Sequence, residues 1–486
     1  MPDRDSTVLR LVDRLQPALQ RYDRAKIRSI VEQLAALRAP MGDQWQPLAQ
    51  LAASIGELGL FREALDLMVE ALGGGPAAKY QKVALLAELG AWGEAYEVLC
   101  TLPDDVPDQA GNAYSRGTAL LYLGRPDEAR EHLERAARMQ PQLGLPWFVL
   151  ALSADLGRES DLAERIIAAE PGIANAIPSQ RAPYYYALGK THADRGEPER
   201  AFAAFARGAR ETKSFVAFDR EADRTEAAEA VRDYSAERIV EIARRQHEPT
   251  ERTLFVTGLP RSGTTLVEQI LTAHSAVGEG AEANRLPLLA REIGGASYPA
   301  LARYVEGHGP ASAARLWHHW LDQLSPMRAR VVDKTVTTSR FLGLAAALLP
   351  GAPLIWLTRD PLDRAWSCFR TNFMGAAMRW SYDLEDIAFH FRLEDELLAR
   401  WQDVLGDRLL TVPYESLAGD PDQWIGRILA HCGLAEEPQV FAPHENRRPV
   451  ATASMMQVRR PIDRGAIGSA EPYRPFLQPF IDAYYR

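Results

Sequence analysis

The chain contains few cysteines. Cys100, Cys368 and Cys432 are the only three among 486 residues, and they lie far apart in the sequence. They form neither a CxxC pair nor the even, closely spaced set that a disulfide framework requires. We therefore expect buried, unpaired thiols and a protein of a reducing compartment.

Long apolar runs are also missing. The first residues, MPDRDSTVLRLVDRL, interleave charged and apolar side chains, whereas a signal peptide needs an uninterrupted apolar core. No window approaches the ~20 apolar residues of a membrane-spanning helix. We therefore expect no membrane span and a cytoplasmic location.

An excess of positive charge is absent as well. The formal net charge is -9, which argues against nucleic-acid binding over a broad surface but leaves room for a small basic pocket. The histidines show no metal-ligand spacing, since His318 and His319 are adjacent and cannot both face one side of a helix. We expect neither a nucleic-acid partner nor a bound metal.

The first half of the chain repeats itself. Five segments share a glycine and, in most of them, an alanine five residues later: LGLFREAL, LGAWGEAY, LGRPDEAR, LGRESDLAE and RGEPERAF. Their glycines, which lie about 31 to 39 residues apart, are Gly59, Gly90, Gly124, Gly157 and Gly196. This spacing brackets the 34-residue tetratricopeptide period. Each unit predicts a helical hairpin whose turn passes through the glycine, because glycine tolerates a left-handed backbone.

The repeats predict an all-α, tetratricopeptide-like array over residues 1–214. A helical cap and linker follow over residues 215–249, and a second domain over 250–486. Arrays of this kind commonly bind a peptide or protein along one face. The alternative is that the array only supports the second domain or forms a dimer interface. The sequence leaves both possibilities and the oligomeric state open.

The second half alternates strands and helices. TLFVTG, RVVDK and APLIWLTRD are short apolar runs that end in glycine or charged residues. This alternation predicts an α/β domain with a parallel sheet covered by helices on both faces. Ligands of such sheets bind beyond the carboxyl ends of the strands. We therefore expect Arg261, Asp333, Lys334 and Arg359 to converge there.

The segment GLPRSGTTL has the layout of a phosphate-binding loop without its lysine. Gly258 and Gly263 have the required spacing, Thr264 replaces the lysine, and Thr265 keeps the Ser/Thr position. A donor that ends at a 5′-phosphosulfate has no γ-phosphate for that lysine to reach. Besides the loop amides, the groups available to hold it are the side chains of Arg261, Ser262, Thr264 and Thr265.

A second phosphate site is predicted in LIWLTRDPLDRAWSCFRTNF. Arg359 ends a strand, Pro361 suits the first turn of the next helix, and Ser367 lies about two turns along that helix. An arginine and a hydroxyl placed in this way can clamp a separate phosphate. The alternative is an exposed arginine and a serine that faces its own helix.

Together these segments resemble a known family. Residues 258–486 resemble a sulfotransferase that uses 3′-phosphoadenosine-5′-phosphosulfate (PAPS), of the bacterial kind with N-terminal tetratricopeptide repeats. That kind is similar to protein-tyrosine sulfotransferases. The matching segments, in order, are PRSGTTLVEQIL, VVDK, LTRDPLDRAWSCFRTNF, YDLEDIAFHFRL, VPYESLAGDP and ASMMQVRRPI.

The resemblance implies a role for individual residues. Glu282 falls at the position of the general base that accepts the proton of the attacking hydroxyl. Lys334 matches the lysine that offsets charge on the departing phosphosulfate bridge. The implied donor contacts are the loop residues Arg261, Ser262, Gly263, Thr264 and Thr265, the 3′-phosphate clamp of Arg359 and Ser367, and Tyr414, Ser454 and Arg460.

The sequence departs from these relatives at two places. The tyrosine-sulfating relatives carry an arginine two residues after the base, whereas this chain has Asn284 there and Arg285 next. Near the C-terminus, Gly468 is followed by Ser469 where the repeat-bearing relatives have a basic residue. The basic residues expected to compensate are Arg459 and Arg464.

We therefore expect transfer of a sulfuryl group from PAPS to a hydroxyl, without a metal. The acceptor stays open between protein tyrosine, a carbohydrate hydroxyl and a small phenol or lipid alcohol. One alternative is a small-molecule kinase, against which the missing lysine counts. The other is a non-catalytic repeat adaptor, against which the joint presence of the implied catalytic and donor-binding residues counts.

Overall fold

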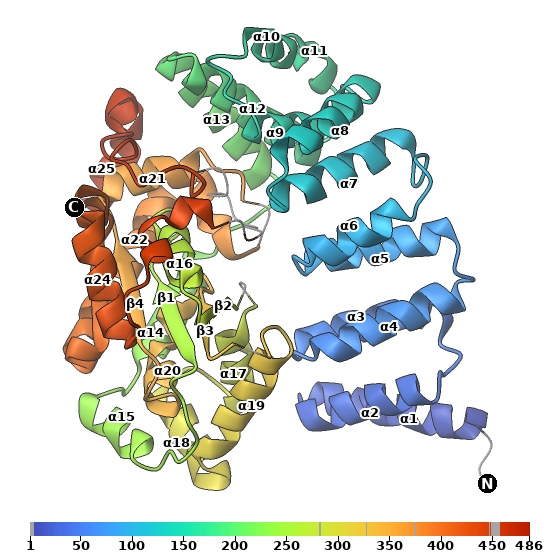
Figure 1. The fold of residues 1–486 in the computed structure, drawn as a ribbon, viewed down its shortest axis with the longest axis vertical. Helices are drawn as coiled ribbons and strands as arrows, with labels where there is room; N and C mark the ends of the chain where they lie inside the picture. The colour runs from blue at the N-terminus through green and yellow to red at the C-terminus, as the bar shows by residue number, and fades with distance from the viewer. Residues whose placement is uncertain (1–3, 281–282, 327, 374–375, 447, 449–456) are drawn as a thin grey trace.

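A helical array leads into an α/β domain, as the sequence predicts (Figure 1). The computed structural model describes residues 4–280, 283–326, 328–373, 376–446, 448 and 457–486, and the structural statements below refer to these. The array comprises α1 (Arg4–Gln20), α2 (Arg24–Ala36), α3 (Trp45–Ser54), α4 (Leu58–Ala71), α5 (Pro76–Glu88), α6 (Trp92–Cys100), α7 (Gln109–Tyr122), α8 (Pro126–Met139), α9 (Gly144–Leu152), α10 (Ser160–Ala168), α11 (Glu170–Ile173), α12 (Pro178–Asp194) and α13 (Pro198–Lys213).

Small residues let the paired helices approach each other. The alanines of the repeat are buried where the second helix of a hairpin packs on the first, and they are Ala64, Ala95, Ala129 and Ala201. In the repeat that contains Gly124, α7 and α8 meet at Gly117, where an added Cβ would lie 2.6 Å from Cγ of Leu133. The repeated alanine is therefore a packing requirement, because a larger side chain would separate the helices.

The turn glycines agree with the prediction in three repeats and differ in the first and the fourth. In the fourth, Gly157 lacks a left-handed φ, and its missing side chain instead makes room for the Asp194 carbonyl oxygen, which would lie 2.5 Å from an added Cβ. Gly90, Gly124 and Gly196 have left-handed φ angles of 78°, 77° and 73°. Gly59 instead lies inside α4, and the left-handed residue of that turn is Gly56, with a φ of 80°. The prediction placed this turn three residues too late because α4 begins about one turn earlier, relative to its buried alanine, than its counterparts do.

Two helices connect the array to the sheet. These are α14 (Arg220–Val231) and α15 (Ala236–Ala243), and they pack against helices of the α/β domain. The domain itself contains β1 (Thr253–Thr257), α16 (Thr264–Ala273), β2 (Val277–Glu279), α17 (Arg285–Ile293), α18 (Tyr298–His308), α19 (Pro310–Asp322), β3 (Arg330–Asp333), α20 (Leu342–Leu348), β4 (Leu354–Thr358), α21 (Pro361–Phe369), α22 (Leu384–Leu405), β5 (Leu409–Pro413), α23 (Tyr414–Gly419), α24 (Pro421–Cys432) and α25 (Gln478–Tyr484). Short 3-10 turns include η2 (Thr338–Phe341), η3 (Ala376–Tyr382) and η7 (Glu471–Leu477).

The five strands form one parallel sheet in the order β2-β3-β1-β4-β5. Side chains alternate between its two faces, as expected for strands buried on both sides. Phe255 packs into the core formed with α17, α19 and α20, whereas its neighbours Leu254 and Val256 pack into the core formed with α16 and α24. The carboxyl ends of β1, β3 and β4 lie side by side, with Phe255 paired to Asp333 and Thr257 to Trp356.

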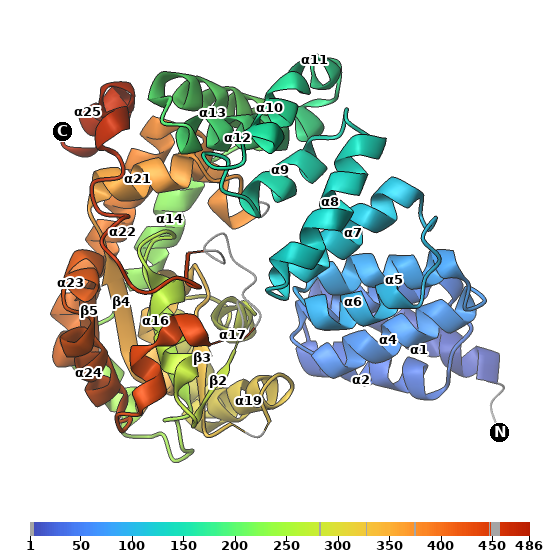
Figure 2. The same cartoon turned by 45° about the horizontal axis from the view of Figure 1, so that its top comes forward.

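The C-terminal part of the array and the α/β domain share one apolar core, and α13 lies beside α21 (Figure 2). Phe202 of α13 lies among three aromatic rings of the other half, with centroid distances of 5.0 Å to Phe476, 5.5 Å to Phe369 and 6.3 Å to Trp366. This contact holds the C-terminal end of the array against α21 and η7. Because α21 carries Ser367, the array supports a helix of the predicted donor site.

The N-terminal part of the array contacts the same domain at a separate place. Glu57 accepts a hydrogen bond from His319 of α19 at 2.8 Å. Gln323 follows α19; its side-chain amide donates to the Gly56 carbonyl at 2.9 Å and accepts from the Gly59 amide at 3.0 Å. The array is therefore attached to the α/β domain at both ends.

The cysteines are unpaired, as expected, but only two of them are buried. Cys368 and Cys432 are enclosed, whereas Cys100 is exposed at the end of α6. Among the described residues, the helices lack the combination of length and apolar character that crossing a membrane requires.

Candidate active site

The loop after β1 is shaped by left-handed residues. Gly258, Arg261 and Gly263 have φ angles of 133°, 68° and 100°. The Ser262 hydroxyl donates to the Leu259 carbonyl at 2.6 Å and closes the turn. Because α16 starts at Thr264, directly after Gly263, the amides of its first turn border the loop. The dipole of α16 makes the loop at its N-terminus suited to an anion.

The side chain of Arg261 links the loop to the second predicted phosphate site. Its Nε donates to the Ser367 hydroxyl of α21 at 2.9 Å, and its Nη2 donates to the Gln457 amide oxygen at 2.9 Å. Arg359 at the end of β4 donates to the Arg261 carbonyl at 2.9 Å. The residues expected to hold two phosphates therefore form one connected group.

Tyr414, the first residue of α23, covers this group. The guanidinium carbon of Arg359 lies 4.9 Å from the centre of its ring. A Cβ at Gly263 would lie 2.8 Å from its Cδ2, so the glycine allows the ring to pack on the loop. Sequence reasoning left open whether Tyr414 is only a packed aromatic, and the structure shows that it packs directly on the site residues.

Several arginines concentrate positive charge here. Burial, with the charges of Arg370 and Arg359, lowers the pKa of Arg261 to about 10. Burial also lowers the pKa of Arg370, and the charge of Arg359 adds to this effect. At neutral pH all three side chains are charged. A phosphate placed among them would relieve their mutual repulsion.

The site fits the donor that the resemblance implies. The buried Nε of Arg359 has no hydrogen-bond partner among the described residues, so an oxygen of a phosphate could occupy its donor. Beside Lys334, the buried Thr335 hydroxyl likewise lacks a described partner. Buried donors without partners are rare in proteins, and they suit a ligand that brings several acceptor oxygens.

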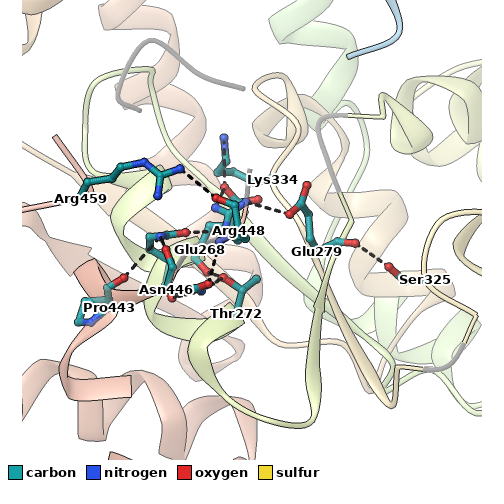
Figure 3. A network of polar contacts seen from close by, with 10 residues as sticks. Glu268, Thr272, Glu279, Ser325, Lys334, Pro443, Asn446, Arg448 and Arg459 are labelled. Atoms are coloured by element: carbon teal, nitrogen blue, oxygen red, sulfur yellow. Dashed lines mark hydrogen bonds and ion pairs between the residues drawn. The ribbon is translucent and has the colours of Figure 1, made fainter. Parts of the chain in front are cut away.

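Lys334 follows β3 and lies in a network of charges in which Glu268 is buried and Glu279 is partly exposed (Figure 3). Its Nζ is 3.7 Å from the carboxylate of Glu268 in α16. That carboxylate also pairs with Nη2 of Arg448 at 2.8 Å. Nη1 of Arg448 contacts Glu279, which ends β2, at 3.2 Å. Burial raises the pKa of Glu279 while the Arg448 charge opposes the shift.

The charged residues expected at the strand ends do not all face one crevice. Asp333 is fully buried and accepts from Arg285 at 2.9 Å. Arg285 also donates to the Gly280 carbonyl at 2.7 Å, so its guanidinium joins the end of β3 to the residue that follows β2. The expectation of convergence is therefore wrong for Asp333, because an unpaired buried carboxylate needs a nearby cation and Arg285 supplies it.

The remaining predicted residues are Glu282, Ser454, Arg460 and the two compensating arginines. Glu282 and Ser454 lie outside the described residues. Arg460 is exposed, and its backbone amide bonds to the Gln457 carbonyl. Of the compensating arginines, Arg464 donates to the Gly419 carbonyl.

The segment around Ser469 is held by α21. The amides of Gly468 and Ala470 donate to the Asp363 carboxylate at 2.7 and 2.8 Å. The Ser469 hydroxyl also contacts it, at 3.3 Å. The residue that replaces the basic group of the relatives therefore helps to fix the loop.

Sequence reasoning missed three charged residues of the site: Glu268, Arg370 and Arg448. Glu268 lies four residues after Thr264, one helical turn along the same face, which is a signal that could have found it. Arg370 follows the helix that carries Ser367. Arg448 itself lies in neither a helix nor a strand, and nothing in its local sequence predicts the contact.

Comparisons with known proteins agree with this geometry. Residues 253–438 match the model of the Sulfotransferase family. An uncharacterized protein from Aquifex aeolicus (strain VF5) is 26% identical over 419 residues, which are 82% of this chain and 54% of that protein. The chain thus spans about half the length of this relative.

The solved structures that match this chain show low identity and low TM-scores. The sulfotransferase domain from the Synechococcus PCC 7002 olefin synthase is 18% identical, with a TM-score of 0.34. The match covers 48% of this chain and 97% of that domain's chain. Sulfotransferase STF9 from Mycobacterium avium is 13% identical with a TM-score of 0.30 and covers 66% and 95%. YrrB, described as a TPR protein with an unusual peptide-binding site, is 19% identical with a TM-score of 0.25 and covers 35% and 86%. From the family match and the architecture, we conclude that this chain carries a sulfotransferase family domain behind an N-terminal array of tetratricopeptide-like helical hairpins.

Proposed function

We propose that this protein transfers a sulfuryl group from PAPS to a hydroxyl acceptor. The observation that carries the proposal is the connected group of Arg261, Ser367 and Arg359, in which the buried Nε of Arg359 has no described partner. This group adjoins a loop with the backbone of a phosphate site and no lysine. It suits a donor that carries phosphates but ends in a sulfuryl group.

Different residues of the chain would bind different parts of the donor. The loop from Arg261 to Thr265 would hold the 5′-phosphosulfate through its amides and hydroxyls. Arg359 and Ser367 would hold the 3′-phosphate, and Tyr414 keeps the Arg359 guanidinium in place. When bound, PAPS supplies the activated sulfuryl group.

Transfer would need one base and one cation. The acceptor oxygen forms a bond to sulfur and gives its proton to Glu282, while the bond between sulfur and the bridging oxygen breaks. The electron pair stays on that oxygen and forms adenosine 3′,5′-bisphosphate (PAP). Lys334, at the end of β3, would stabilise the charge that grows there. A monoanionic sulfuryl group needs positioning and cations rather than a metal.

Protein tyrosine is one proposed class of acceptor, and the array is its proposed docking surface. The buried pair between Arg285 and Asp333 removes Arg285 from the surface. A peptide would therefore be held by other residues. Incubating the protein with cell lysate and PAPS labelled in its sulfate, followed by separation of labelled proteins, sugars and lipids, would identify the acceptor class.

Thermal unfolding in the presence of nucleotides tests the donor. We expect PAP to raise the unfolding temperature and ATP with magnesium to leave it unchanged. A ligand that binds only the folded state stabilises it by about 2.7 kcal/mol at 100 times its dissociation constant. Equal shifts with the two nucleotides would favour the kinase alternative, and no shift with PAP would contradict the proposal.

A further inference from the structure

One turn of the helical array touches the network around Lys334. Gly124 forms the turn between α7 and α8 with a left-handed φ of 77°. A Cβ placed on it would lie 2.8 Å from the guanidinium carbon of Arg459, and closer still to Nη2. The glycine thus leaves just enough room for this arginine of the C-terminal segment.

Arg459 in turn holds the residue at the centre of the network. Its Nη2 donates to the backbone carbonyl of Arg448 at 3.1 Å (Figure 3). Burial lowers the pKa of Arg459, and the nearby Arg448 charge adds to this effect. The Arg459 guanidinium is therefore enclosed between the array and the backbone of Arg448, and its position depends on both.

Arg448 and Lys334 share the carboxylate of Glu268. Nη2 of Arg448 lies 2.8 Å from it, and Nζ of Lys334 lies 3.7 Å from it. Both contacts are ion pairs, and the one to Arg448 is shorter. Without Arg448, the nearby cation left to pair with the buried Glu268 carboxylate would be Lys334. The ammonium would then be drawn toward α16.

We propose that the repeat array helps to build the sulfotransferase site, with Gly124 and Arg459 positioning Arg448 so that Arg448 shares the charge of Glu268 with Lys334. The inference rests on the proposed function, because it assigns Lys334 to the reacting group of PAPS. Arg448 and Arg459 act here as positioning residues. The array thus has a role in turnover that is separate from any acceptor it binds.

Matched alanine substitutions in two repeats test the contact. Gly90 occupies the equivalent turn of the preceding hairpin with a φ of 78°, and a Cβ there meets nothing within 4 Å. Gly124→Ala and Gly90→Ala therefore impose the same backbone cost, but only the first displaces Arg459. We expect the two variants to change the unfolding temperature equally. The turnover number with PAPS should fall about tenfold in Gly124→Ala alone, and a tenfold change corresponds to about 1.4 kcal/mol.

Binding measurements separate positioning from general damage. Calorimetric titration with PAPS in the cold should give dissociation constants within about twofold of wild type in both variants, because Lys334 stabilises a charge that grows on the bridging oxygen only during transfer. PAP carries that charge on the same oxygen, as part of its 5′-phosphate, so its binding should weaken in Gly124→Ala only. Equal PAP affinity and turnover in the two glycine variants would overturn the inference.

Double variants test the order of the contacts. If Gly124→Ala acts through Arg459, it should add nothing to the loss that Arg459→Ala already causes. If Arg448 acts by neutralising Glu268, the turnover lost in Arg448→Met should be largely restored in Arg448→Met/Glu268→Gln. The inference would be overturned if the losses of Gly124→Ala and Arg459→Ala multiply in their double variant. It would also be overturned if Glu268→Gln restores no turnover to Arg448→Met.

The two proposals fail in distinguishable ways. A wild-type protein that binds neither PAP nor PAPS would overturn the proposed function and, with it, this inference. A wild-type protein that binds both, with Gly124→Ala and Gly90→Ala behaving alike, would overturn this inference and leave the sulfotransferase function standing.

Discussion

Arg261 and Ser367 are joined by a hydrogen bond of 2.9 Å between Nε and the hydroxyl oxygen, across 106 positions of sequence. One residue belongs to the loop after β1 and the other to α21. The bond brings the two predicted phosphate sites into contact, so a change at either residue should affect the binding of the whole donor.

Ser367→Ala should weaken the binding of PAP by about 2- to 10-fold, the value of one hydrogen bond of 0.5–1.5 kcal/mol. The substitution removes the acceptor of Arg261 and a donor for the proposed 3′-phosphate. Isothermal titration with PAP measures the change. Ser153→Ala, which removes a hydroxyl bonded to the Leu150 carbonyl in the array, should bind PAP as the wild type does. Unaltered affinity in Ser367→Ala would place the 3′-phosphate elsewhere.

Arg359→Ala should have a larger effect on donor affinity. It removes a charge and the bond to the Arg261 carbonyl, and charge-assisted bonds of 1.5–3 kcal/mol correspond to about 10- to 100-fold weaker binding. Because a phosphate contact exists equally in the ground and transition states, KM for PAPS should rise more than kcat falls. Arg392→Ala, an exposed position on α22, is the control. A fall in kcat with unchanged KM would argue against a binding role.

Glu282→Gln should lower turnover by about 10² to 10⁴-fold, the contribution of a positioned general base. PAP affinity should stay near the wild-type value, because the amide keeps the shape of the side chain. Glu279→Gln is the matched comparison, three residues earlier, and should retain more than about a tenth of the activity, since Glu279 is assigned to the Arg448 pair rather than to the proton transfer. The reverse pattern would make Glu279 the base.

The pH dependence of stability should report on Glu279. Burial raises its pKa above the ordinary value of 4.5, so the folded protein holds this proton more tightly than the unfolded chain. Between the ordinary and the raised pKa, the folded state binds more protons, and the free energy of unfolding therefore falls as pH rises through this window. Glu279→Gln should lose less stability than wild type between pH 4.5 and neutrality.

Denaturant unfolding at several pH values measures this difference. Glu396→Gln, which changes an exposed carboxyl of α22, should follow the wild-type profile. Parallel profiles for wild type and Glu279→Gln would mean that the pKa of Glu279 is the same in the folded and unfolded states.

Phe202→Ala should destabilise the protein, because Phe202 packs against Phe476, Phe369 and Trp366. A fully buried phenylalanine costs about 3–5 kcal/mol on truncation, and we expect about 1–3 kcal/mol for this half-buried one. Chemical denaturation gives the value. Phe215→Ala, whose side chain is 53% exposed, should change stability little. Equal losses would mean that the aromatic contact between the halves contributes nothing specific.

The architecture of this protein follows from local signals in its sequence. The spacing of Gly90, Gly124 and Gly196 and the alanines that follow them specified helical hairpins, because a close helix pair needs small residues and its turn needs a left-handed one. Apolar runs that end at Gly258, Lys334 and Arg359 specified parallel strands with their ligand-binding ends together. These signals are local, so they can be recognised without knowing which elements pack together.

The pairing of charges, and the dependence of one part of the chain on another, follow instead from how distant segments pack. Arg285 and Asp333 are 48 residues apart, and Arg448 meets Glu268 over a still longer separation. The contact between Gly124 and Arg459 joins the two halves of the chain. A buried charge takes whichever opposite charge the fold brings near, and no periodicity or spacing along the chain encodes that choice. For the same reason, the glycine pattern predicted the turn at Gly124 but not that its missing side chain makes room for an arginine of the catalytic half.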